Sequence, residues 1–333
     1  VRDFENEFKN EFEDILTLDG GNFFQGHPFG IVDSGKTMIE WMNKIKYDAM
    51  VPGNTDFIFG YKNLVKLSKF ADFPFLASNI FYEENDLPVF NPYTIVNIND
   101  VSIGIIGVVS ASMDDVVLSK NIEGIYFTSE IESIEKSMKE LKEKDINIII
   151  VLSSLGIPWN RDRAYSEFLK ESNEDNKINN SLELGYYLEG VDLIISGGIS
   201  KGYSKPWYDK YSHVYAFQNY GNGTEFGHFK IKYSLNENSF QGYEFVSNNR
   251  ISQTLFIDDF SFDKEQHFWI QNKISESVKK VYSDIDWFTQ IDGDKSTGLM
   301  DKSQNRILLD LENKNKVVSS RWNVPNIDTE MID

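Results

Sequence analysis

A match to a phosphate-binding loop is the first feature of this sequence that could do chemistry. Residues 30–37 (GIVDSGKT) have the spacing G-x-x-x-x-G-K-[ST], in which backbone N–H groups and the lysine hold phosphates. That chemistry needs a buried strand directly before the first glycine. Residues 23–29 (FFQGHPF) contain two turn-forming residues instead. We therefore interpret the match as accidental and expect an exposed loop here, with Thr37 near the start of a helix.

Several blocks that join apolar, strand-like runs to polar or glycine-rich turns form a second and broader pattern. The main ones are 16–26 (LTLDGGNFFQG), 53–60 (GNTDFIFG), 149–156 (IIVLSSLG) and 191–201 (VDLIISGGISK). Between them stand 38–50 (MIEWMNKIKYDAM), 73–80 (FPFLASNI) and 104–109 (GIIGVV). Ordered blocks of this kind are far more specific than any single motif.

In this order the blocks resemble the catalytic domain of the 5′-nucleotidase branch of metallophosphatases, over about residues 10–235. Block 16–26 resembles the family motif D-A-G-D-x-x-Q-G, and block 53–60 resembles G-N-H-[ED]-F-D-x-G. Block 149–156 is similar to the strand that ends in a ligand histidine. Block 191–201 is similar to V-D-x-I-I-x-G-G-H-[ST]-H. The resemblance implies a layered α/β sandwich of the calcineurin-like type, with two central mixed sheets flanked by helices.

The resemblance also implies a chemistry, and this sequence departs from it. The family holds two divalent metals bridged by a carboxylate and ringed by histidines, and a metal-bound hydroxide attacks the phosphate. The bridging Asp position is occupied here by Asn22. Thr55 stands at the histidine that assists the leaving group, and Ile58 stands at its carboxylate partner. Neither side chain can move a proton near neutral pH.

The remaining ligand positions are also altered. Ser154 and Ile199 each replace a ligand histidine, Lys201 replaces the last one, and Asn54 alone is retained. A lysine there adds repulsion toward metal, although it could stand in for the missing cation and pair with Asp56 or Asp19. The family's opening Asp-x-His strand has no counterpart in the sequence as given, and no choice there would restore the positions lost downstream. The histidines His27, His213, His228 and His267 fall on none of the ligand positions.

Periodicity predicts the elements that must position these residues. Phe4, Phe8 and Phe12 lie on one helical stripe, and further helices are expected at 37–45, 61–70, 131–144 and 263–282. Strands are expected at 15–18, 49–51, 75–78, 146–152, 191–196 and 214–218, with hairpins 93–98/101–109 and 229–233/242–246. We interpret 160–185 as a polar surface excursion. Residues 1–262 are expected to form the metallophosphatase-like domain, and 263–333 a helix and irregular tail that pack on it.

Composition limits the partners. The net charge is −19, and the 33 basic residues form no dense run, so nucleic acid and anionic lipid are excluded as partners. There is no cysteine, which excludes disulfides and thiolate metal sites. No window is apolar enough to span a membrane, and no signal-peptide pattern follows Val1. The family often lies outside the cytoplasm, so we expect an extracytoplasmic protein in the periplasm or on the cell surface, with a cytoplasmic one still open.

Three hypotheses follow for function. The first is a catalytically inactive binding or scaffold module with a protein partner and no cofactor. The second is a non-hydrolytic protein that holds a small anionic ligand, a nucleotide or phosphate, in the old cleft. Its binding residues would be Asn22, Asn54, Thr55, Ser154 and Lys201. The third is an active phosphohydrolase with an atypical metal site, using one metal or none. Asp33, Asp48 and Asp56 are available carboxylates for it, but no spacing among them demands a general acid and base. We expect the first, because the glycines that set the backbone are kept while the reactive residues change.

Overall fold

The computed structural model describes residues 15–24, 28–170, 177–221, 223, 225–246, 252–254, 263–281, 309–310 and 316–317. The chain divides into two compact units, Val1–Lys264 and Glu265–Asp333. The predicted helix over 4–12 lies outside the described residues. No helix in the described ranges is long and apolar enough to cross a membrane.

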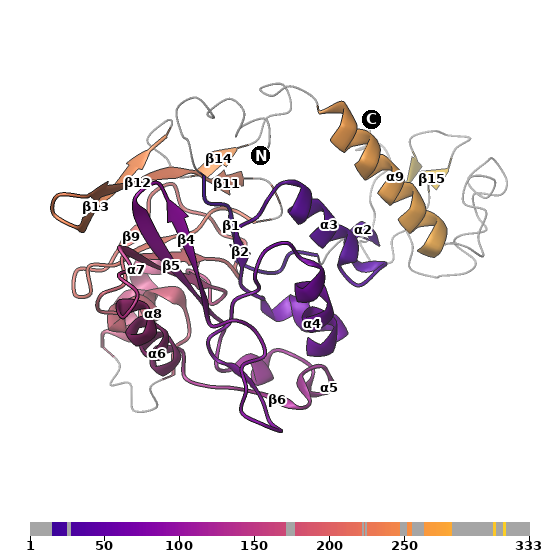
Figure 1. The fold of residues 1–333 in the computed structure, drawn as a ribbon. Helices are drawn as coiled ribbons and strands as arrows, with labels where there is room; N and C mark the ends of the chain where they lie inside the picture. Colours follow the sequence, from indigo (N-terminus) through magenta and orange to yellow (C-terminus); the bar gives the residue numbers. More distant parts are fainter. Residues whose placement is uncertain are drawn as a thin grey trace. The chain divides into compact units, whose positions relative to one another are not determined.

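A six-stranded mixed sheet is the centre of the first unit (Figure 1). Its order is β4 (Tyr93–Ile98), β5 (Val101–Val108), β7 (Ile148–Ser153), β8 (Leu193–Ser196), β10 (Tyr215–Phe217) and β9 (Trp207–Tyr208). The inner neighbours β5, β7, β8 and β10 run parallel, and β4 and β9 pair antiparallel at the edges. Strand β7 is an uninterrupted apolar run because both faces of the sheet are covered.

Three helices cover one face of this sheet (Figure 1). They are α6 (Glu130–Lys142), α7 (Arg161–Phe168) and α8 (Ser181–Tyr187). Ile134 and Leu141 of α6 pack in one core with Val151 of β7. The interpretation of 160–185 as a polar surface segment is wrong for its two helices. Leu182 and Leu184 of α8, and Tyr165 and Phe168 of α7, are buried in the same core. Polar composition concealed these short helices, because α8 also buries polar residues such as Ser181 and Glu183.

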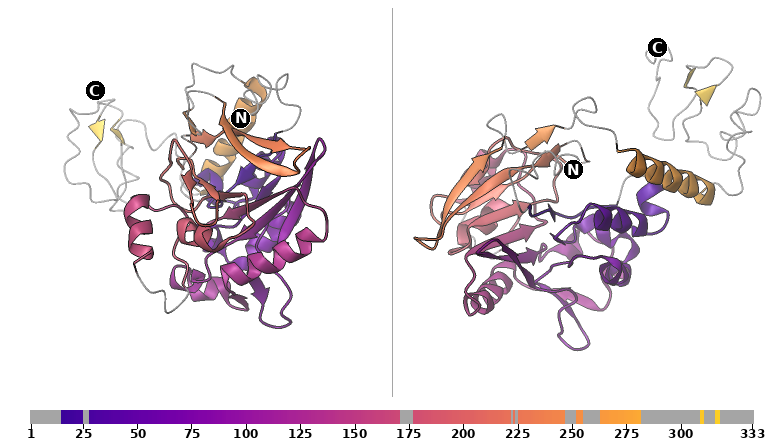
Figure 2. Two further views of the ribbon diagram at one scale, coloured as in Figure 1. Left: turned by 90° about the vertical axis from the view of Figure 1, so that its left-hand side faces the viewer. Right: turned by 45° about the horizontal axis from the view of Figure 1, so that its top comes forward.

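The opposite face of the sheet packs on a second layer. Parallel strands β1 (Leu18–Asp19) and β2 (Ala49–Met50) lie with helices α3 (Lys36–Lys44) and α4 (Tyr61–Phe70), and the antiparallel pair β12 (Phe229–Ser234) and β13 (Ser239–Phe245) completes the layer. This hairpin lies beside the six-stranded sheet in both views of Figure 2, and the rings of Phe217 and Phe229 stack at 4.0 Å. The predicted layered α/β sandwich of mixed sheets and flanking helices is confirmed.

Short elements join these layers. They are α2 (Pro28–Ile31), η1 (Asn54–Phe59), β3 (Ile80–Tyr82), η2 (Met113–Asp115), α5 (Ser119–Ile122), β6 (Ile125–Phe127), β11 (Glu225–Gly227) and β14 (Ser252–Thr254). The strand expected at 75–78 forms only isolated bridges from Phe75 to Met50 and from Leu76 to Asn91. The antiparallel pair of β3 and β6 was not predicted.

The second unit contains most of α9 (Lys264–Val281), which confirms the helix expected at 263–282. It also contains the two-residue strands β15 (Leu309–Asp310) and β16 (Lys316–Val317), which pair antiparallel. The packing of residues 263–333 on the first unit stays a prediction.

Candidate functional site

The segment that matches a phosphate-binding loop forms the end of α2, a turn over residues 32–35 and the start of α3. Gly30 lies inside α2, and the described residues 20–24 before it form no strand. The expected loop is present as this turn, but its residues are half-buried or buried and not exposed. Thr37 is the buried second residue of α3, so its expected place near a helix start is confirmed. Its hydroxyl and its N–H both donate to Asp33 Oδ2, at 2.6 and 3.0 Å. Asp33 therefore stabilises the first turn of α3, and the match carries no phosphate chemistry.

Close backbone contacts at glycines bring together the turns of the four main blocks that resemble family motifs. A Cβ on Gly20, after β1, would lie 2.7 Å from the Cα of Gly197, after β8. A Cβ on Gly198 would lie 2.1 Å from the carbonyl oxygen of Ser154, after β7. Gly21 contacts Gly53 in the same way. Only glycine permits these approaches, so the turns that follow β1, β2, β7 and β8 meet at one edge of the sheets.

Asn22 and Thr55 occupy the centre of this edge. Asn22 has a positive φ of 65°, a conformation that asparagine tolerates better than most residues. Its Oδ1 accepts hydrogen bonds from the N–H of Thr55 at 3.0 Å and from the hydroxyl of Thr55 at 2.7 Å. The predicted bridging position and the predicted proton-transfer position therefore contact each other directly, and the amide oxygen already has two donors.

Asp56 fixes the backbone beneath this pair. Its fully buried carboxylate accepts hydrogen bonds from the N–H groups of Asn22 at 2.7 Å, Gly53 at 2.8 Å and Phe23 at 3.0 Å. Burial raises the pKa of Asp56 to about 7, against these donors and with a smaller contribution from the charge of Asp19. Burial also raises the pKa of Asp19 to about 6. Asp56 therefore joins the turn after β1 to the turn after β2 by hydrogen bonds.

Ser154 and Ile199 belong to the turns after β7 and β8 at the same edge. The hydroxyl of Ser154 is buried and has no hydrogen-bond partner among the described residues. Ile199 packs over Gly156, where an added Cβ would lie 2.4 Å from Ile199 Cγ1. A hydrocarbon thus fills space where the family has an imidazole. Ile58 is 45% exposed on η1, and Asn54 is exposed at the start of the same element.

Lys201 points to aromatic rings. Its ammonium donates to the hydroxyl of Tyr220 at 2.8 Å, and this bond raises the pKa of Lys201 above its ordinary value. The same ammonium lies 5.0 Å from the ring centroid of Tyr220 and 5.5 Å from those of Trp159 and Tyr203. The idea that Lys201 pairs with Asp56 or Asp19 is therefore wrong, because rings and a phenol hold the cation instead.

The donor set does not fit the binuclear metal centre that the family resemblance implies. At the positions of carboxylate and imidazole the site presents a neutral amide, a lone hydroxyl, a hydrocarbon and an ammonium. Within the described ranges no group of three or more His, Asp or Glu side chains could hold a metal ion. Of the described histidines, His213 bonds to Tyr208 at 2.7 Å and His267 lies in α9. His27 lies outside the described residues.

Sequence reasoning missed a group of side chains around Lys201. We call it the cation–aromatic cluster; it comprises Trp159, Arg161, Lys201, Tyr203, Trp207 and Tyr220. The guanidinium of Arg161 lies 4.6 Å from the ring centroid of Tyr203 and 5.7 Å from that of Trp207. The available signal was the alternation of aromatic and basic residues at 159–161 and 201–207, which lie far apart in the chain.

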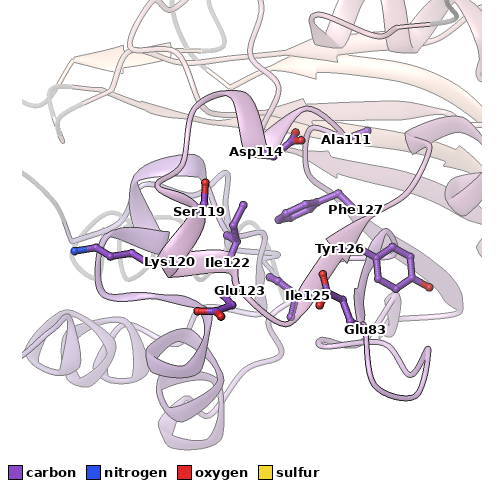
Figure 3. Close-up of a pocket in the computed structure, with 10 residues that line it drawn as sticks. All are labelled: Glu83, Ala111, Asp114, Ser119, Lys120, Ile122, Glu123, Ile125, Tyr126 and Phe127. Carbon is purple, nitrogen blue, oxygen red and sulfur yellow. The ribbon is translucent and has the colours of Figure 1, made fainter.

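An open pocket of about 710 Å³ lies elsewhere, between β3, β6 and α5 (Figure 3). Phe127 and Tyr126 point in different directions from adjacent positions of β6, as strand alternation requires. The lining includes Glu83, Asp114 and Glu123 and none of the predicted site residues. This pocket is separate from the edge where the turns after β1, β2, β7 and β8 meet.

Comparisons with known proteins agree with this architecture. No family model matches the chain. A putative 5′-nucleotidase from Staphylococcus aureus superposes with a TM-score of 0.62 at 19% identity, over 82% of this chain and 51% of that one. A calcineurin-like phosphoesterase from Bacillus subtilis gives 0.59 at 21% identity, over 83% and 86%. These likenesses define the fold class as that of the calcineurin-like phosphoesterases.

Sequence relatives narrow the class. The 5′-nucleotidase of Gloydius brevicauda venom is 32% identical over 196 residues, which cover 57% of this chain and 29% of that protein. The human 5′-nucleotidase is 30% identical over 152 residues, which cover 44% and 26%. The matched region thus spans less than a third of these curated relatives. Together with the fold, these matches confirm the predicted resemblance to the 5′-nucleotidase family of metallophosphatases.

Proposed function

We propose that this chain is a catalytically inactive 5′-nucleotidase-like domain that acts as a binding or scaffold module. The observation that carries the proposal is the double hydrogen bond from Thr55 to Asn22 Oδ1, at 3.0 and 2.7 Å. A bridging ligand must offer negative charge and free lone pairs to two cations. Here the atom at that position is neutral and already accepts two hydrogen bonds.

The other substitutions support the same proposal. Hydrolysis of a phosphate ester needs an activated nucleophile and a group that protonates the leaving oxygen. Thr55 and Ile58 supply no such acid, and Ile199 supplies no ligand. The hydrogen bonds from backbone N–H groups to Asp56 and the close contacts at the glycines hold the backbone in place. A backbone frame that is kept around altered chemistry supports a binding role.

A hydrolysis assay tests this proposal. Purified chain is incubated with AMP and, separately, with p-nitrophenyl phosphate in the presence of manganese. We expect no turnover above buffer. Turnover that disappears in Asn22→Ala or Ser154→Ala would show that the cleft is catalytic and would overturn the proposal. Turnover that both variants retain also overturns the proposal if it follows the chain through gel filtration, whereas activity that separates from the chain comes from a contaminating phosphatase.

A second candidate is a non-hydrolytic protein that binds a small anion, such as phosphate or a nucleotide, in the old cleft. The buried and unpartnered hydroxyl of Ser154 favours it, since an anion could accept that hydrogen bond. Calorimetry with inorganic phosphate and AMP tests it, with wild type compared with Ser154→Ala and Lys201→Ala. Heat that is lost in Ser154→Ala supports this candidate. Absence of heat with wild type eliminates it.

We further propose a protein partner and a location outside the cytoplasm. Two similar proteins support the location by their names, one a snake venom enzyme and one a 5′-nucleotidase precursor from Thermus thermophilus. Fractionation of native cells, followed by antibody detection of the chain, tests it. Recovery with cytoplasmic markers would contradict the proposed location and leave the binding role to be tested separately.

A further inference from the structure

Hydrogen bonds and ring contacts connect the elements that carry the cation–aromatic cluster. Arg161 is the first residue of α7, and the side chain of Asn160 caps that helix by accepting from the N–H of Arg163 at 3.1 Å. Tyr165 of α7 packs against Trp207 with ring centroids 4.9 Å apart and donates a hydrogen bond to Asp209. A surface ordered before binding loses less conformational entropy on association.

Neither cation of the cluster is neutralised by a carboxylate. Arg161 donates to the carbonyl oxygen of Lys205 at 3.0 Å, and Lys201 donates to the hydroxyl of Tyr220. No ion pair in the described part of the chain includes either residue, whereas the neighbouring Arg163 is paired with Glu167 at 2.8 Å. The chain has 52 acidic and 33 basic residues, so two cations near one ring, that of Tyr203, without a carboxylate partner are a local exception.

The aromatic side chains give the cation–aromatic cluster the composition of a protein interface. Trp, Tyr and Arg are the residues enriched at positions that dominate binding energy. Trp159 is 68% exposed although it is the bulkiest side chain type. The indole N–H of Trp207 is buried without a hydrogen-bond partner among the described residues. Rings and cations in one patch favour a ligand that carries both an apolar group and an anion.

The chain's overall charge decides between classes of anionic partner. Polyanions such as nucleic acid or an acidic membrane would meet a net charge of −19 over most of the surface. One or two carboxylates on a protein segment contact only the local field, because salt screens charges beyond about 8 Å at physiological ionic strength. A free phosphate would leave the exposed face of Trp159 unused.

We propose that the cation–aromatic cluster is a docking surface for a segment of a partner protein that presents carboxylates beside an aromatic side chain. The carboxylates pair with Arg161 and Lys201, and the aromatic group packs on Trp159. This inference rests on the proposed binding role and names the surface that performs it. It also gives the lysine at a lost metal-ligand position a function in binding.

Fluorescence anisotropy with the full chain tests this proposal. The probe is a labelled, end-blocked peptide Gly-Asp-Phe-Glu-Gly, and its control is the uncharged analogue Gly-Asn-Phe-Gln-Gly. We expect saturable binding of the acidic peptide below about 1 mM and none of the analogue. Trp159→Ala, Arg161→Ala and Lys201→Ala should each weaken binding by at least about tenfold. Lys120→Ala, an exposed lysine at the pocket of Figure 3, should leave binding unchanged.

Thermal unfolding of each variant checks that the fold is kept, and Trp159→Ala is the safest because its ring is mostly exposed. Failure of the acidic peptide to bind would overturn the proposal, as would equal binding of the analogue or equal binding by all variants. Stronger binding to phosphatidylserine vesicles or to a DNA oligonucleotide than to the peptide would also overturn it. These outcomes are independent of hydrolysis. A failed docking surface with no turnover leaves the inactive-domain proposal standing, whereas turnover that belongs to the chain itself defeats that proposal whatever the peptide does.

Discussion

The amide oxygen of Asn22 accepts both the backbone N–H and the hydroxyl of Thr55, at 3.0 and 2.7 Å. The family resemblance predicts a bridging carboxylate and a histidine at these two positions. The two hydrogen bonds from Thr55 therefore occupy the amide oxygen of Asn22 at the edge of the sheets. Their contribution to stability can be measured separately from any function.

Substitution of Asn22 should cost stability. We expect Asn22→Ala to lower the free energy of unfolding by about 2–4 kcal/mol, because it removes two hydrogen bonds and places alanine at a positive φ. Urea denaturation followed by circular dichroism measures the change. The matched control is Asn54→Ala at an exposed position of the adjoining element, which should change the value by no more than about 0.5 kcal/mol. Equal effects of the two substitutions would contradict the central role of the Asn22 pair.

The buried carboxylate of Asp56 should make stability depend on pH. Its pKa is about 7 in the folded chain against an ordinary value of 3.8, so the folded chain binds more protons between these values. Stability contributed by this group is therefore fully present below about pH 4 and is lost as pH rises through about 7. Asp19 acts in the same direction up to about 6, and His228, whose pKa burial lowers to about 4, acts in the opposite direction.

Asp56→Asn isolates this contribution, since it removes the titrating group and leaves Asp19 and His228 in place. We expect the free energy of unfolding to decline between about pH 4.5 and pH 7.5, a window that includes the raised pKa of Asp56, about 7. This decline should be shallower in the variant than in wild type. Chemical denaturation at several pH values measures both curves. Parallel curves would mean that Asp56 does not titrate in this window.

Gly156 and Ile199 should be energetically coupled. Gly156 has a φ of 80°, and a Cβ there would lie 2.4 Å from Ile199 Cγ1. We expect Gly156→Ala alone to destabilise the chain by about 3 kcal/mol or more, from backbone strain and steric overlap. In the Ile199→Ala background the overlap is relieved, so the cost should fall by about 1–2 kcal/mol. A double-mutant cycle by urea denaturation tests this. Additive effects would show that Ile199 does not fill the space over Gly156.

Much of this structure could be predicted from sequence because its signals are local. Helix α4 and strands β4 and β5 follow directly from apolar periodicity, with Asn99 at a positive φ in the turn of the hairpin. Helix α8 was missed because its polar residues Asn180, Ser181 and Glu183 are buried and satisfied by one another and by neighbouring strands. A polar stretch with internal partners cannot be told from a surface loop by composition.

The same limit applies to the site. Ordered glycine motifs made it possible to predict Asn22, Ser154 and Ile199 as altered ligand positions, and close backbone contacts at those glycines bring the turns that carry them to one edge. The direction of Lys201 could not be found in this way. Its partner Tyr220 and the neighbouring Trp159 lie far away in sequence, so their contact depends on the packing of α7 and β10. Side-chain direction at a shared edge is set by tertiary structure.

Metal content tests the central claim most directly. The purified chain is incubated with excess manganese or zinc, passed through a desalting column and analysed by inductively coupled plasma mass spectrometry. We expect well below one metal ion per chain, because an amide, a hydroxyl, a hydrocarbon and an ammonium stand where the family has charged or imidazole ligands. Two ions retained per chain, and lost in Asn22→Ala, would contradict this account.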